Sequence, residues 1–157
     1  MTFRLDGDIP RIRLPSPGVP RLAGELGRHT CFEAFIAVEG QRAYHEFNFA
    51  PSREWTAYAF RKYRKGGLLV DEMICRHIAV RSTASRFELD TLVLLDRLSA
   101  LHSRTSLRVG LSAVVEASDG LSYWALRHPA EKPDFHDPDG FALVLEPTGS
   151  GRLPSLS

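Results

Sequence analysis

The sequence predicts an all-β fold: an antiparallel β-sandwich or jelly-roll of about eight to ten strands with at most one short helix. Two observations carry this prediction. Hydrophobic residues recur at every second position in most segments, which is the period of a half-buried strand. Turn signals rich in Gly, Pro, Asp and Ser separate these segments, and only residues 96–103 have a helix-like pattern.

The clearest element is a hairpin at residues 43–63. Residues 43–50 alternate between two faces, the turn signal PSRE follows, and residues 55–63 return as a second strand. In the first strand, His45, Phe47 and Phe49 point one way, and Tyr44, Glu46 and Asn48 point the other. In a sandwich, the simplest interpretation of this polar row is the solvent side.

The other segments complete a single domain at residues 1–147, followed by a flexible tail at 148–157. A Pro/Gly-rich surface loop is expected at 14–27, and the basic cluster RKYRK is interpreted as a solvated strand end or turn. SDG is a tight hairpin turn of the Asp-Gly kind. The remaining strands are expected at residues 30–38, 74–81, 85–94, 105–117, 121–128 and 140–147.

Composition indicates an ordinary globular protein. Its 157 residues are 43% hydrophobic and 25% charged, with a formal net charge of +1. Nothing is basic enough to predict nucleic-acid binding, and no segment has the apolar length of a signal peptide core or a membrane span. The two cysteines, Cys31 and Cys75, form no CxxC pair. We therefore expect a cytoplasmic protein with reduced thiols and no membrane association.

No motif predicts catalysis, a metal or a cofactor. The chain lacks the G-x-S-x-G elbow, the P-loop and the dinucleotide-binding G-x-G-x-x-G pattern. The stretch DFHDPDG does not have EF-hand spacing, and His128 and His136 match no zinc template. The sequence predicts a protein that is not an enzyme and needs no cofactor, with haem or metal binding as an alternative.

Two residue types, a glutamate and the tryptophans, could bind a ligand. Glu33 shares a face with Cys31 and Phe35, and an unpaired buried carboxylate would cost several kcal/mol. Arg28 or a ligand hydroxyl would remove that cost, so a ligand-lining role and a plain surface role both stay open. Trp55 and Trp124 lie near strand ends, where an aromatic ring can stack on a sugar, although the core is the usual place for tryptophan.

Four motifs in order resemble the bacterial DOMON-like domain family, which is similar to carbohydrate-binding module family 9. They are RHTCFEAF, YHEFNFAPSREWTAYAF, LSAVVEASDGLSYWAL and HPAEKPDFHDPDGFAL, and they cover roughly residues 3–146. The resemblance implies a non-catalytic sandwich that binds a small molecule on one face, by analogy a carbohydrate or, as in other DOMON relatives, haem. Trp124 would be the aromatic platform, and Asp134 and His136 would be rim or structural groups. By position, it implies a ligand site formed by Glu33, Glu46, Asn48, Trp55, Trp124, Asp134 and His136, and we expect Arg28 to pair with one of the carboxylates.

Two departures from the family pattern bear on the function. An aromatic residue usually precedes RHTCFEAF, whereas this chain has Leu26-Gly27. The segment MTFRLDGDIPRI is similar to the second strand of the family, so either the true start codon lies upstream or the sheet has a bare edge. A bare edge favours pairing with another chain. A homodimer or a protein-interaction domain is therefore the alternative from a different functional class.

Overall fold

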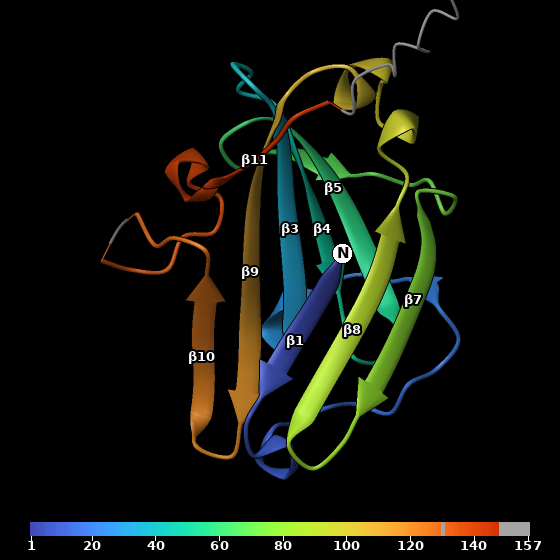
Figure 1. The fold of residues 1–157 in the computed structure, drawn as a ribbon, viewed down its shortest axis with the longest axis vertical. Coiled ribbons are helices and arrows are strands. Elements are labelled where there is room, and N and C mark those ends of the chain that lie inside the picture. The colour runs from blue at the N-terminus through green and yellow to red at the C-terminus, as the bar shows by residue number, and fades with distance from the viewer. Residues whose placement is uncertain (130, 148–157) are drawn as a thin grey trace, which may run out of the picture.

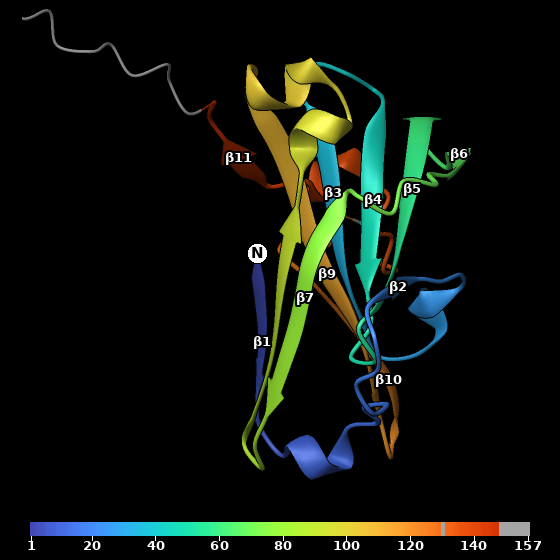
Figure 2. The ribbon, with the colours of Figure 1, turned by 90° about the vertical axis from the view of Figure 1, so that its right-hand side faces the viewer.

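A computed structural model describes residues 1–129 and 131–147. The predicted tail at 148–157 lies outside these residues. The described part is an all-β sandwich in which two sheets face each other (Figures 1 and 2), and it contains short 3-10 turns but no α-helix. None of its helical segments has the length and apolar character needed to cross a membrane.

The larger sheet contains eight strands. Its main path, in spatial order, is β10 (Gly120–Ala125), β9 (Leu107–Ala117), β3 (Cys31–Val38), β4 (Tyr44–Phe49), β5 (Glu54–Lys62) and β2 (Arg21–Leu22). Two short strands extend its edges: β11 (Leu143–Leu145) pairs with β9, and β6 (Lys65–Leu68) pairs with β5. Every pair is antiparallel except β2–β5.

The smaller sheet has the antiparallel order β1 (Thr2–Asp6), β8 (Arg86–Val93) and β7 (Cys75–Ser82). It lies across the inner face of the larger sheet (Figure 2). Arginines and acids alternate on its outer side. Arg81, for example, pairs with both Glu88 and Asp90. This charged outer layer is what the solvent side of a sandwich requires.

The predicted hairpins at 43–63 and 74–94 are confirmed as β4–β5 and β7–β8. The strand count is eleven, above the predicted range, because two short strands, β2 and β6, were not recognised. β2 lies inside the segment predicted as a loop, and β6 follows the RKYRK turn. Residues 96–103 contain two 3-10 turns, η3 (Leu95–Arg97) and η4 (Ala100–Ser103), in place of one short helix.

The main core lies between the sheets and is apolar. Phe47 and Phe49 on β4 are fully buried there, with Trp55 beside them on β5. Phe32 stacks on Phe87 across the two sheets, with ring centroids 5.7 Å apart. This interlocking of aromatic rings fixes the sheets to each other and holds the inner face of β3, β4 and β5 in place.

A second, smaller core covers the outer face of the same sheet. Phe35, Ala37, Tyr44 and Phe141 form it, and Phe141 comes from the loop after β10. Gly110 on β9 allows the close approach, because a Cβ there would lie 2.8 Å from the Phe141 ring. The interpretation of the polar row as the solvent side is therefore wrong, because Tyr44, Glu46 and Asn48 are all buried. The loop after β10 packs on the Tyr44 end of the row, and the η2 turn (Leu26–Arg28) packs on β3 and β4.

Candidate functional site

The outer face of the larger sheet carries a pocket of about 310 Å³, here called the acidic pocket. Its floor is formed by neighbouring strands, since Glu33 on β3 is paired with Asn48 on β4, and Glu46 on β4 with Tyr58 on β5. Paired residues project from the same face of a sheet. The lining residues are Glu25, Leu26, Gly27, Glu33, Glu46, Asn48, Tyr58, Phe60, Arg64 and His136.

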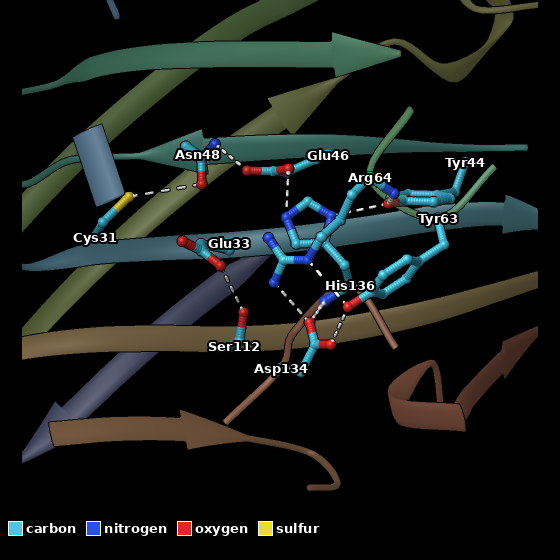
Figure 3. Close-up of polar contacts among 10 residues, drawn as sticks. All are labelled: Cys31, Glu33, Tyr44, Glu46, Asn48, Tyr63, Arg64, Ser112, Asp134 and His136. Carbon is cyan, nitrogen blue, oxygen red and sulfur yellow. Dashed lines mark hydrogen bonds and ion pairs between the residues drawn. The ribbon is translucent and has the colours of Figure 1, made fainter. Parts of the chain in front are cut away.

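A chain of polar contacts runs along the floor from Asn48 to Tyr44 (Figure 3). The Asn48 side-chain amide donates to Glu46 Oε1 at 2.7 Å, and Glu46 Oε2 lies 3.5 Å from His136 Nε2. The Tyr44 hydroxyl lies 2.8 Å from His136 Nδ1 and accepts from the backbone N–H of Arg64 at 3.1 Å. In the tautomer that carries the His136 proton on Nε2, toward Glu46, Nδ1 accepts the hydrogen bond of the Tyr44 hydroxyl.

Glu33 is the more isolated of the two carboxylates. It is 6% exposed, and its Oε2 accepts a hydrogen bond from the Ser112 hydroxyl at 3.0 Å. The η2 turn (Leu26–Arg28) lies beside it, since a Cβ on Gly27 would be 3.4 Å from Glu33 Oε1. The expected charge pair with Arg28 does not form. Arg28 is exposed, and its guanidinium lies 3.5 Å from Glu25.

Burial changes the protonation of these groups. It raises the pKa of Glu33 to about 7, and the nearby charge of Glu46 adds to the effect. Burial also raises the pKa of Glu46, against the opposing influence of Asn48 and Arg64. It lowers the pKa of His136 to about 4. Near neutral pH the pocket therefore contains a neutral imidazole and a Glu33 carboxyl that is partly protonated.

The Cys31 thiol sits at the inner end of this polar row. Its sulfur lies 3.9 Å from Asn48 Oδ1 (Figure 3). Burial, reinforced by the charge of Glu33, raises the thiol pKa well above its usual value. A buried thiol held in its protonated form is a poor nucleophile, so Cys31 contributes packing and a weak hydrogen bond rather than reactivity.

The open side of the pocket is bordered by an ion pair from the β5–β6 turn. Arg64 contacts Asp134 at 2.8 Å, and the Tyr63 hydroxyl donates to the same carboxylate at 2.6 Å. Although burial alone would raise it, these hydrogen bonds lower the pKa of Asp134. Asp134 also accepts from the backbone N–H of His136. The pair thus fastens the loop that presents His136 to the pocket.

Both tryptophans lie away from this pocket. Trp55 is 3% exposed and belongs to the core between the sheets. Trp124 is 62% exposed, and its indole N–H donates to Ser122. It is paired with Ala113 and, through it, with Phe32 of the inner face. The expected grouping of Trp124 with Glu33 in one site is therefore wrong: Trp124 projects from the opposite side of the sheet from Glu33, which is paired with Ser112.

The structure brings together five of the eight residues predicted for the site: Glu33, Glu46, Asn48, Asp134 and His136. Sequence reasoning missed Tyr58, Phe60 and Arg64. Alternation along residues 55–63 could have placed Tyr58 and Phe60 on the same face as Thr56, away from Trp55. Arg64 gave no such signal, since its cluster has the composition of a solvated turn.

No protein-family model, curated protein or solved structure matches this chain. Within residues 1–129 and 131–147, no group of three or more His, Cys, Asp or Glu side chains is placed to hold a metal ion. The fold and the site thus define a β-sandwich with a polar pocket on the outer face of its larger sheet.

Proposed function

We propose that the protein is a non-catalytic binding module that holds a saccharide-like or other polar small molecule in the acidic pocket. One observation carries this proposal: Glu33 and Glu46 are buried in one pocket, and in the described part of the chain neither pairs with a Lys or Arg side chain. Buried carboxylates that form no ion pair with Lys or Arg cost stability, and such costs are concentrated at functional sites.

The groups around the pocket suit a ligand rich in hydroxyl groups. Glu46 and Asn48 offer acceptor and donor atoms that hold each other in position. Glu33, near its pKa, can donate or accept. Tyr58 and Phe60 supply an apolar wall, the usual counterpart of a sugar ring. A volume of about 310 Å³ lies at the small end of ligand pockets, as for one or two sugar units.

Two further points support a non-catalytic module. The thiol nearest the pocket is held protonated. Glu46 accepts from the Asn48 amide and His136 Nδ1 faces the Tyr44 hydroxyl, so within the described residues neither group is hydrogen-bonded to a Ser or Cys nucleophile. The motif resemblance to DOMON-like domains and carbohydrate-binding module family 9 points in the same direction, toward a ligand on one face of a sandwich.

The test is a thermal-shift screen followed by isothermal titration against monosaccharides, amino sugars, polyols and nucleotide sugars. We expect at least one compound to raise the Tm and Glu46→Gln to weaken its binding tenfold or more. Glu72→Gln, at an exposed position outside the pocket, is the matched control and should bind normally. A folded protein that responds to no compound would count against the proposal.

A second candidate function is self-association through the edge strand β10. This edge strand exposes Leu121, Tyr123 and Trp124, which are 46%, 46% and 62% accessible. By contrast, the β1 edge at the front of the small sheet carries Arg4 and Asp6, which disfavour edge pairing. Light scattering would detect a dimer, and Tyr123→Lys should return it to a monomer without affecting the acidic pocket.

A further inference from the structure

A second cavity, here called the basic cavity, lies beyond the Tyr44–His136 pair. It has a volume of about 480 Å³. Its walls come from the β3–β4 turn, the end of β5, the beginning of β9 and the loop around Pro138. His136 lines both sites, and in Figure 3 Tyr44 and Tyr63 lie on one side of it, with Glu46 and Glu33 on the other. The His136 ring is therefore the partition between them.

The charge of the basic cavity is opposite to that of the acidic pocket. Arg42, Lys62 and Arg108 line it, against a single carboxylate, Glu39. His136 adds no charge near neutral pH, because burial lowers its pKa to about 4. Within the described residues, none of the three cations forms an ion pair. Three cations against one carboxylate give this concave site a net positive field.

Arg108 is already held in place. Its Nε donates to the Phe141 carbonyl at 3.3 Å, and its Nη2 donates to the Pro138 carbonyl at 2.9 Å. These bonds use one edge of the guanidinium and leave the Nη1 donors free. A cation fixed by backbone carbonyls loses little conformational entropy when an anion binds. The loop that closes the outer face thus also orients a binding group.

The floor of the basic cavity is apolar. Ala37, Tyr44 and Phe141 belong to the outer-face core and line this cavity as well. A ligand that fills such a site needs an apolar body in addition to its negative charge. We propose that the basic cavity binds a small organic anion, a carboxylate or phosphate monoester on an apolar or aromatic body. This site is independent of the ligand proposed for the acidic pocket.

Isothermal titration with four probes tests the proposal: phenyl phosphate, benzoate, inorganic phosphate and uncharged benzyl alcohol. We expect phenyl phosphate or benzoate to bind, with affinity falling as salt is added, and benzyl alcohol to bind at least tenfold more weakly. Binding of phenyl phosphate alone assigns a phosphate ligand, and binding of benzoate alone assigns a carboxylate. Inorganic phosphate should bind more weakly than phenyl phosphate, because it leaves the apolar floor uncovered.

Charge-reversal variants locate the binding. Lys62→Glu and Arg42→Glu, both at exposed positions, should each weaken the bound probe tenfold or more while the circular dichroism spectrum stays unchanged. Arg61→Glu is the matched control, since Arg61 neighbours Lys62 and does not line the cavity. Glu33→Gln, in the acidic pocket and bonded to Ser112 rather than to His136, should leave probe binding intact, which separates this site from the acidic pocket. Failure of every probe to bind, equal binding of benzyl alcohol, or equal weakening by Arg61→Glu would overturn the proposal.

Discussion

Strands β3 and β4 are buried on both faces, and a different part of the protein covers each face. Phe32, Phe47 and Phe49 pack inward against the second sheet. Glu33 and Glu46 face outward beneath a loop. Burial of apolar side chains stabilises the fold, whereas burial of a carboxylate raises its pKa and costs stability. The inner face therefore maintains the sandwich, and the outer face maintains a polar pocket at the expense of stability.

The largest effect should come from breaking the inner face. Phe47→Ala removes a fully buried ring that stacks with Phe49 at 6.3 Å. Loss of the ring and the cavity it leaves should lower the free energy of unfolding by about 3–5 kcal/mol. Urea denaturation measures this directly. A loss below about 1 kcal/mol would mean that the inner face is not the main source of stability.

Unlike Phe47→Ala, Glu33→Gln should raise the free energy of unfolding, and the size of this gain should depend on pH. The Glu33 pKa is about 7 in the folded protein and 4.5 as the reference value. Between these values the folded state keeps a proton that the unfolded chain has released, so wild-type stability falls as pH rises through this window. The variant should be more stable than the wild type by about 3 kcal/mol at pH 8 and equally stable at pH 4.

The comparison with the variant isolates Glu33 from other titrating groups. Burial lowers the pKa of both His45 and His136 to about 4, and these groups make stability rise with pH from about 4 to 6.5. Both histidines are present in both proteins, so their effect cancels in the difference. Glu72→Gln, at an exposed position outside the pocket, is the control and should change the free energy of unfolding little. A constant difference at all pH values would contradict the raised pKa of Glu33.

Tyr44→Phe tests the contact that supports the partition between the two cavities. The hydroxyl bonds His136 Nδ1 and the backbone N–H of Arg64, and its removal leaves both without that partner. The free energy of unfolding should fall by about 1–2 kcal/mol, measured by urea denaturation. Tyr123→Phe, on an exposed edge strand, is the matched control and should change little. Equal losses in the two variants would contradict this prediction, because the Tyr44 hydroxyl would then stabilise the fold no more than an exposed hydroxyl does.

The sequence predicted the sandwich because local alternation specifies strands and their turns. Alternation also placed Glu46 and Asn48 on one face of β4, which the structure confirms. It could not show that a loop ninety residues later covers that face, because the contact between Tyr44 and His136 joins distant segments. Nor could it show that Gly110 admits the Phe141 ring. The floor of the site was thus predictable from periodicity, and its cover was not.

The two tryptophans also differ in where the fold places them. Both were candidates for a ligand platform, but Trp55 is enclosed by the core and Trp124 lies on the edge strand β10.

Trp124→Ala should change the free energy of unfolding by no more than about 0.5 kcal/mol, because the side chain is mostly exposed and its hydrogen bond is to Ser122 on its own strand. Trp55→Ala should cost about 3–5 kcal/mol in the same urea titration. Trp124→Ala should also leave ligand binding in the acidic pocket unchanged, since register places its ring on the opposite face of the sheet. Loss of binding in this variant, with the fold intact, would indicate that the ligand binds at the β10 edge and would contradict the acidic pocket as the binding site.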